Sequence, residues 1–211
     1  MKKVLFIFAA VLFVLVGCGS NEKTSDDEVV KEQPDVQDDQ QKQVDEEGFL
    51  KETDDPMEAG NKNNGIEVFN DEWDYTYLIK DWYSNDDTDE DGFNYIDFDG
   101  YKVKFSIALL EDTEEKNVIG VFAETLNDTD KTVQYNMDME LITDKQEQAQ
   151  TDDMYGIGNS KPGIKTKGFV KVDLEYEVPE SFKVTFEPPW DDEDEFNETI
   201  GEPIESEFTK E

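Results

Sequence analysis

The stretch YKVKFSIALL, residues 101–110, has an apolar side chain at every second position. The alternating residues are Val103, Phe105, Ile107 and Leu109. Successive side chains of an extended strand point to opposite faces, so this spacing places all four on one face. A helix would instead need apolar residues three and four positions apart. The stretch therefore predicts a β-strand with one face in the protein interior.

The same period of two recurs in three later segments. Their apolar positions are Val133, Tyr135, Met137, Met139 and Leu141 in the first, Val170, Val172, Leu174, Tyr176 and Val178 in the second, and Phe182, Val184 and Phe186 in the third. Residues 117–126, NVIGVFAETL, are apolar at nearly consecutive positions, which is typical of a central strand covered on both faces. We expect a separate strand from each of these segments.

Turn-forming residues separate the strands. Clusters rich in Asn, Asp, Pro and Gly or Glu occur at residues 127–130, 159–163 and 178–180, and such residues favour the backbone conformations of turns. No convincing apolar stripe with the helical period of 3.6 residues interrupts them. The sequence therefore predicts an all-β domain over residues 65–211, folded as an antiparallel β-sandwich.

The chain before this domain has a different composition. Residues 19–48 are rich in Asp, Glu, Gln and Lys and contain no aromatic residue. Such a segment buries too little apolar surface to offset its loss of conformational entropy on folding. The acidic, polar character continues through residues 57–64, and aromatic residues become frequent only after Gly65. We therefore expect a disordered acidic linker over residues 18–64.

The first 17 residues have the layout of a secretory signal peptide. Lys2 and Lys3 precede an apolar run that ends at Gly17. A transmembrane anchor is the alternative, but the run is shorter than the roughly 20 residues that span a bilayer. The following sequence, Leu-Val-Gly-Cys over residues 15–18, resembles the lipobox of bacterial lipoproteins.

The resemblance to the lipobox implies cleavage before Cys18 and attachment of diacylglycerol to its sulfur. Two or more acyl chains give stable membrane anchoring, whereas one chain binds only reversibly. The chain would then be held by lipid at the extracytoplasmic face of the cell membrane. Cys18 is the only cysteine, so the mature protein would fold without a disulfide.

Composition excludes several classes of function. The chain has 55 acidic residues against 19 basic ones, a net charge of −36, and no histidine. All of the basic residues are lysines. Nucleic-acid binding requires a basic surface, so no nucleic-acid partner is expected. Without histidine, Ser–His–Asp hydrolysis and most zinc sites are excluded as well. Carboxylate chemistry, lysine chemistry and the binding of hard metal ions remain.

Residues 100–208 resemble a family of Gram-positive lipoproteins that carries a domain of unknown function. The likeness lies in the strand from Asn117, the turn Asn-Asp-Thr-Asp at 127–130, the strand ending LITDKQEQ, and the segment PGIKTKGFVKVDLEYEVPESFKVTFEPP at 162–189. The resemblance implies an immunoglobulin-like sandwich at the cell surface. It implies no activity and no catalytic residues.

The segment DTDEDGF, residues 87–93, matches the first half of an EF-hand calcium loop. Asp87, Asp89 and Asp91 would supply carboxylates, Gly92 the sharp turn, and Phe93 its backbone carbonyl. The match fails at position twelve, where Phe98 replaces the bidentate Glu. An ordinary solvated acidic turn is the alternative and is favoured. We expect no cofactor, with calcium at this loop as the other hypothesis.

Two further segments stand out. Residues 73–83, WDYTYLIKDWY, would form either a packed aromatic strand, which is favoured, or a platform that binds sugars, peptides or proteins. Residues 188–196, PPWDDEDEF, would be a solvated loop or a second metal or partner site.

These observations predict a lipoprotein without enzymatic activity, anchored at the membrane, that binds an extracellular protein or cell-wall polymer. The first alternative is a calcium- or cation-responsive module that uses the loop at residues 87–93. The second is a glycan hydrolase based on paired carboxylates, which is disfavoured because no pair stands out.

Overall fold

The structure is a computed structural model that describes residues 50–151, 157–175 and 177–211. Its strands are β1 (Glu52–Thr53), β2 (Val68–Asn70), β3 (Thr76–Ser84), β4 (Asn94–Phe98), β5 (Tyr101–Asp112), β6 (Asn117–Asn127), β7 (Val133–Tyr135), β8 (Met139–Thr143), β9 (Gln148–Gln150), β10 (Gly158–Ser160), β11 (Lys165–Asp173), β12 (Ser181–Phe186), β13 (Trp190–Asp191) and β14 (Ile204–Lys210). Two short helical segments, α1 (Pro56–Ala59) and the 3₁₀ turn η1 (Lys62–Asn64), precede β2. The predicted all-β class is confirmed.

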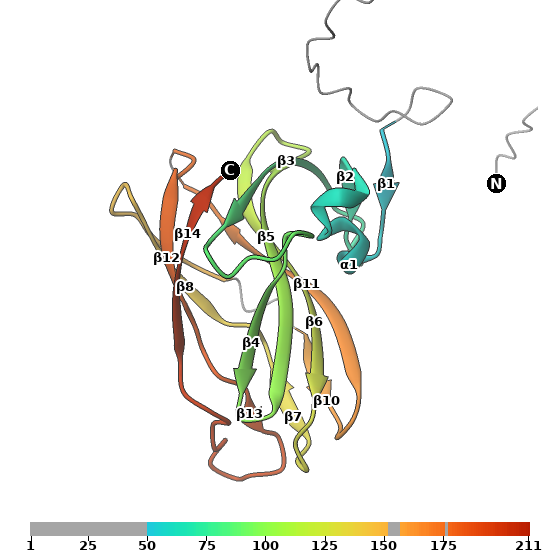
Figure 1. Ribbon diagram of the computed structural model, residues 1–211, viewed down its shortest axis with the longest axis vertical. Coiled ribbons are helices and arrows are strands. Elements are labelled where there is room, and N and C mark those ends of the chain that lie inside the picture. The colour runs from blue at the N-terminus through green and yellow to red at the C-terminus, as the bar shows by residue number, and fades with distance from the viewer. Residues whose placement is uncertain (1–49, 152–156, 176) are drawn as a thin grey trace, which may run out of the picture. The chain divides into compact units, whose positions relative to one another are not determined.

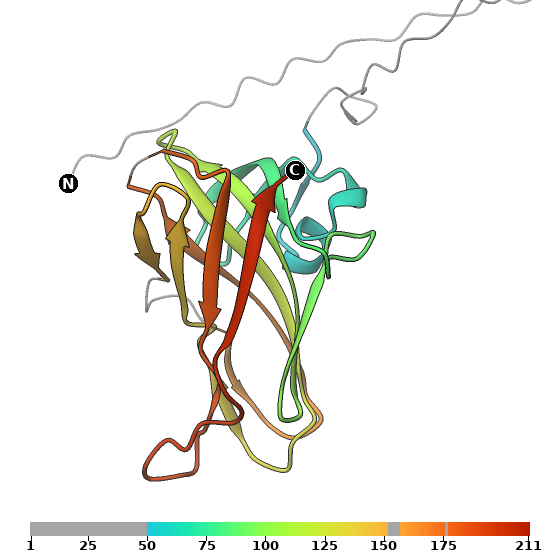
Figure 2. The same ribbon diagram turned by 60° about the vertical axis from the view of Figure 1, so that its left-hand side comes forward.

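One large curled sheet forms both layers of the sandwich. Its strand order is β11-β6-β5-β3-β14-β12-β8-β9, and β4 extends the line of β3 along β5. Among the described strands, every pairing is antiparallel except that of β1 with β2, which is parallel. The layers join where β14 pairs with β3 through two residue pairs, Thr209 with Ser84 and Lys210 with Tyr83. A small sheet, β10-β7-β13, lies at the end of the sandwich opposite α1 (Figures 1 and 2).

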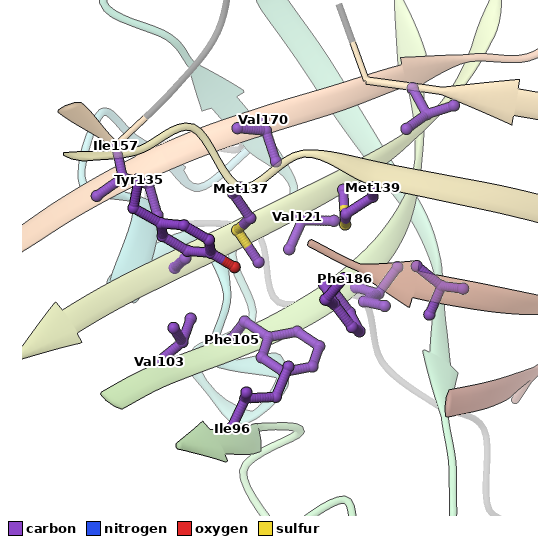
Figure 3. Packing of buried hydrophobic residues seen from close by; sticks show 14 of the residues in the cluster. Ile96, Val103, Phe105, Val121, Tyr135, Met137, Met139, Ile157, Val170 and Phe186 are labelled. Carbon is purple, nitrogen blue, oxygen red and sulfur yellow. The ribbon is translucent and has the colours of Figure 1, made fainter. Parts of the chain in front are cut away.

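The main core lies between the two layers and contains the predicted alternating residues. Val103, Phe105, Ile107 and Leu109 of β5 are buried there. The ring of Phe105 lies 4.9 Å from that of Phe186 and 6.2 Å from that of Phe208, measured between centroids. These contacts join β5 of one layer to β12 and β14 of the other, and Figure 3 shows Phe105 directed toward Phe186.

A second apolar cluster covers the outer face of the same sheet. On β5 the residues between the predicted ones, Ala108 and Leu110, are also buried, because they pack with Phe69, Tyr77, Phe122 and Phe169. Ala59 of α1 belongs to this cluster and is fully buried. One strand therefore has apolar surroundings on both faces, although its alternation predicted burial of only one.

Residues 50–64 correct the predicted domain boundary. The sequence placed them in the acidic linker, but β1 pairs with β2, and α1 packs on β6 and β11. Asp55 caps α1 by accepting a hydrogen bond from the N–H of Met57, and Pro56 occupies the first turn, where it is tolerated. The folded domain begins at least fifteen residues before Gly65. Residues 18–49, the rest of the expected linker, lie outside the described residues.

The segment 133–141 also differs from prediction, because it forms two strands instead of one. β7 belongs to the small sheet and β8 to the large sheet. The chain leaves β7 at Asn136, and Met137 has a positive φ of 57°. All five predicted apolar side chains are nonetheless buried. Val170 and Val172 are buried as predicted, Leu174 and Val178 pack at the margin of the core, and Tyr176 lies outside the described residues.

One type of turn recurs in the described residues. A leading Asp or Thr accepts hydrogen bonds on one side-chain oxygen from the N–H groups two and four positions later. The residue three positions later has positive φ and donates its N–H to the carbonyl of the leading residue. The five turns span residues 71–75, 89–93, 112–116, 143–147 and 194–198. In each turn, three residues separate the first residue from the fifth, and the last of the three has the left-handed conformation.

Candidate functional site

Of the four residues predicted to bind metal, Asp89, Asp91 and Phe93 lie in the 89–93 turn between β3 and β4, and Asp87 lies two residues before that turn. Asp89 is its leading residue: one carboxylate oxygen accepts from the N–H of Asp91 and of Phe93, at 3.0 and 2.8 Å. The other accepts from the hydroxyl of Tyr95 at 2.9 Å. The carbonyl of Phe93, the ligand expected at position seven of the calcium loop, accepts a hydrogen bond from the N–H of Asp89 at 2.8 Å. The groups expected to bind calcium therefore form the internal hydrogen bonds of the turn.

The other predicted ligands of the loop make different contacts or are exposed. Asp91 accepts a hydrogen bond from the side-chain amide of Asn63, and Asp87 is exposed. The Phe93 ring is buried, with Lys104 Nζ 3.9 Å from its centre. In the part of the chain that the structure describes, no three Asp, Glu, His or Cys side chains are grouped closely enough to share a metal ion. The structure thus places Asp87, Asp89 and Asp91 in one loop without gathering their carboxylates around one point.

Asp89 should make the stability of this turn depend on pH. Burial favours its neutral form, but hydrogen bonds from Phe93, Tyr95 and Asp91 outweigh burial and hold the pKa of its carboxyl below the usual range. A carboxyl whose pKa falls on folding stabilises the folded state above its unfolded pKa of about 3.9, and this stabilisation is lost as pH falls through the folded pKa.

We expect Asp89→Ala to lower the free energy of unfolding by about 1 kcal/mol at pH 7, as the loss of a capping side chain does, and by less at pH 3. Asp87→Ala is the matched control, because Asp87 is exposed, and should change stability little. Urea denaturation at both pH values, with calcium or chelator at matched ionic strength, measures both effects. A rise in stability with calcium that Asp89→Ala abolishes would instead favour the calcium hypothesis.

The aromatic segment 73–83 divides between core and surface. Tyr77 and Tyr83, on β3, are buried as the favoured prediction expected. Trp73 and Tyr75 precede the strand, and their exposed fractions are 59% and 54%. Exposed aromatic side chains of this size are frequent anchors in binding sites. The surface part of the segment is therefore the stronger candidate for a functional role.

Trp73 and Tyr75 are presented by a well-ordered turn between β2 and β3. Asp71 is buried and accepts hydrogen bonds from the N–H groups of Trp73 and Tyr75 on the same oxygen, both at 2.9 Å. The N–H of Asp71 donates to the carbonyl of Tyr75, and Asp74 takes the left-handed position with φ of 64°. A turn fixed in this way loses little conformational freedom when its aromatic side chains bind a ligand.

A cavity of about 310 Å³ adjoins Trp73. It lies among α1, the 71–75 turn and β11, and it is lined by Asp54, Pro56, Phe69, Asp71, Glu72, Trp73, Ile157, Lys167, Gly168 and Phe169. Ligand pockets in proteins commonly begin at about this volume and combine apolar walls with a few polar groups. We refer to the cavity together with Trp73 as the Trp73 site.

The charged groups of the Trp73 site are mainly acidic. Among the described residues that line it, Lys167 is the one cation, and Lys167 Nζ forms an ion pair with Asp55, the cap of α1. Burial opposes ionisation of Asp55, but the hydrogen bond from Lys167 and the N–H of Met57 hold the pKa of its carboxyl below the usual range. The carboxyls of Asp54, Asp71 and Glu72 also line the cavity. Lys167 forms its ion pair with Asp55 and not with these three carboxylates.

The acidic segment 188–196 forms part of a hairpin at the other end of the sandwich. β13 pairs with β7, and Lys131 Nζ lies 3.2 Å from carboxylate oxygens of Asp191 and Glu198. Phe196 is 89% exposed at the tip. Lys131 thus forms ion pairs at the base of the hairpin. All of residues 188–196 are described, and their carboxylates form no group of three that could hold a metal ion.

No protein-family model matches this chain, and no curated protein matches it in sequence. Cys18 lies outside the described residues. Among the residues that are described, no helix is both long and apolar enough to cross a membrane.

The sequence indicated the aromatic segment 73–83 but not the cavity beside it. The walls of the cavity come from α1 and β11, which lie far apart in the chain.

Proposed function

We propose that this protein is a lipoprotein anchored to the extracytoplasmic face of the cell membrane through Cys18, and that it acts by binding an extracellular protein or cell-wall polymer. The observation that carries the binding role is the Trp73 site, where a fixed turn holds an exposed tryptophan beside a cavity. The lipobox at residues 15–18 supports the anchor. The likeness to Gram-positive lipoproteins with immunoglobulin-like domains supports the same location.

The alternatives are weaker on specific grounds. For the calcium-responsive module, both carboxylate oxygens of Asp89 already accept hydrogen bonds, one from N–H groups within the 89–93 turn and the other from the hydroxyl of Tyr95 on β4. For the glycan hydrolase, Asp71 of the Trp73 site accepts two backbone N–H groups that position Trp73 and Tyr75. That arrangement suits a structural carboxylate better than a general acid or a nucleophile. We propose that the protein binds without turnover.

Expression of the full chain in a Gram-positive host tests anchoring and binding together. The native chain should partition into detergent and, after cross-linking on intact cells, should yield a discrete partner. Cys18→Ala should shift the chain to the aqueous phase or medium, because the lipid supplies the membrane affinity. Trp73→Ala should keep the detergent partitioning and lose the partner.

Phe196→Ala is the matched control for binding, because Phe196 is also exposed but lies in the hairpin that follows β13. It should retain the partner. If Cys18→Ala does not change the detergent partitioning, the lipid anchor is contradicted. If Trp73→Ala does not change capture of the partner, the binding site is contradicted.

A further inference from the structure

We propose that the Trp73 site takes a cationic side chain, a lysine ammonium or arginine guanidinium, and that the partner presents it on a basic peptide segment. This inference rests on the proposed binding role and specifies the chemistry of its partner. It comes from the combination of an exposed aromatic face, carboxylates in the same cavity, and the charge of the whole chain.

The aromatic part of the site can receive a cation. Tryptophan attracts cations over its ring face more strongly than tyrosine or phenylalanine does. Lys104 occupies the face of Phe93 elsewhere in the domain, but within the described residues no lysine Nζ lies over Trp73. The rings of Phe69 and Phe169 also line the cavity, 4.9 Å apart between centroids. These two residues are 1% and 9% exposed, so most of the apolar surface offered to the methylene groups of a lysine or arginine comes from Trp73 and Pro56.

The polar part of the site can hold the charge. Glu72 and Asp54 are exposed and line the cavity, so an entering cation would meet two carboxylates beside the indole. Asp71 is 8% exposed, and its second carboxylate oxygen accepts a long hydrogen bond from the Tyr77 hydroxyl at 3.5 Å. That distance leaves the oxygen able to accept a stronger hydrogen bond from a charged donor.

The charge of the whole chain favours the same partner. A net charge of −36 repels anionic polymers and attracts cationic ones, and a cleft lined by carboxylates concentrates that attraction. A neutral sugar ring could also stack on Trp73, but it would gain nothing from the three carboxylates as charges. The charge distribution therefore favours a cationic partner over a neutral one.

A short oligolysine peptide is the probe, and its fully acetylated form is the neutral counterpart. We expect the oligolysine to bind the full chain by calorimetry and to change tryptophan fluorescence, with weaker binding at higher salt. The acetylated peptide should not bind. Trp73→Ala should weaken binding about tenfold, the size expected for a partly desolvated cation–π contact.

Glu72→Gln and Glu195→Gln form a matched pair, because each removes one negative charge from an exposed residue. Glu72→Gln should weaken binding several-fold, and Glu195→Gln, in the distant 194–198 turn, should leave it nearly unchanged. Thermal melts of each variant establish that it is folded. Glu72→Gln also keeps the test decisive if Trp73→Ala is unstable.

The outcomes separate this inference from the proposed function. If Glu72→Gln and Glu195→Gln weaken oligolysine binding equally, the binding arises from attraction by the net charge and the Trp73 site is overturned. Suppose instead that a neutral wall-glycan fragment binds, that Trp73→Ala abolishes this binding, and that oligolysine does not bind. That result would overturn the cationic ligand but preserve the binding role of the Trp73 site. If oligolysine does not bind and Trp73→Ala does not change capture of the partner at the cell surface, both the cationic ligand and the binding role of the Trp73 site are overturned.

Discussion

Replacing Phe105 by alanine should lower the free energy of unfolding by about 3 to 5 kcal/mol, the usual cost of removing a buried phenylalanine ring. Phe105 is 1% exposed and contacts the rings of Phe186 and Phe208 in the opposite layer. Its removal leaves a cavity at the point where the two layers meet. Because these layers are halves of one curled sheet, the loss should be felt in a single cooperative transition.

Guanidinium denaturation followed by circular dichroism measures this change. Phe196→Ala removes the same ring from a position that is 89% exposed, and it should alter stability by less than about 0.5 kcal/mol. Similar losses for the two variants would contradict the placement of Phe105 between the layers.

Gly60→Ala should lower the free energy of unfolding by about 1 to 3 kcal/mol, the range for overpacking a close-packed site. Gly60 caps α1 with φ of −70° and ψ of −14°, which alanine adopts readily. A Cβ atom there would lie 2.6 Å from Ser106 Oγ and 2.8 Å from Phe122 Cβ. Backbone preference alone favours alanine, so a loss of stability would come from packing against the sheet.

Thermal and urea denaturation of the full chain measure the effect of Gly60→Ala. Gly163→Ala is an informative comparison, because a Cβ atom there meets nothing within 4 Å but its φ of 75° strains alanine. If Gly60→Ala leaves stability unchanged or raises it, α1 does not pack closely on β6 and β11, and residues 50–64 belong to the linker after all.

The main core could be read from the sequence because alternation reports directly on which face of a strand is buried. It predicted burial of Val103, Phe105 and Ile107 correctly. It could not predict the break between β7 and β8, because Met137 continues the period of two even though its backbone turns there. A pattern of side chains indicates which face is covered but not which strand lies beside it.

The second cluster and the Trp73 site could not be predicted for a different reason. α1 has four residues, too few for a helical period to be recognised, and it lies in a segment whose composition resembles a linker. Its contribution depends on Ala59 and Gly60, whose small side chains allow close approach to β6. The cavity then needs Phe169 and Lys167 from β11, more than a hundred residues later.

The acidic composition leaves two interpretations of the sequence pattern at residues 87–93, a structural turn and a calcium loop. Asp89 and Asp71 lead turns of the same kind, each with a residue of positive φ three positions later. The sequence feature that the turns led by Asp share is an Asp followed three positions later by Gly, Asp, Glu or Asn. In a chain with 55 acidic residues, spacing alone does not separate such a turn from a metal loop.

The position of β14 in the sheet has a consequence for the order of folding. β14 comprises residues 204–210 and lies between β3 and β12, and its pairing with β3 joins residues that are 125 to 127 positions apart in the chain. Such distant pairing is slow to form, because a long loop must close before any contact compensates for it. During synthesis, the hairpin of β5 and β6 can form early. The two layers can close on each other only once the last strand has emerged, so until then the apolar faces of both layers are open to chaperones, proteases and other chains.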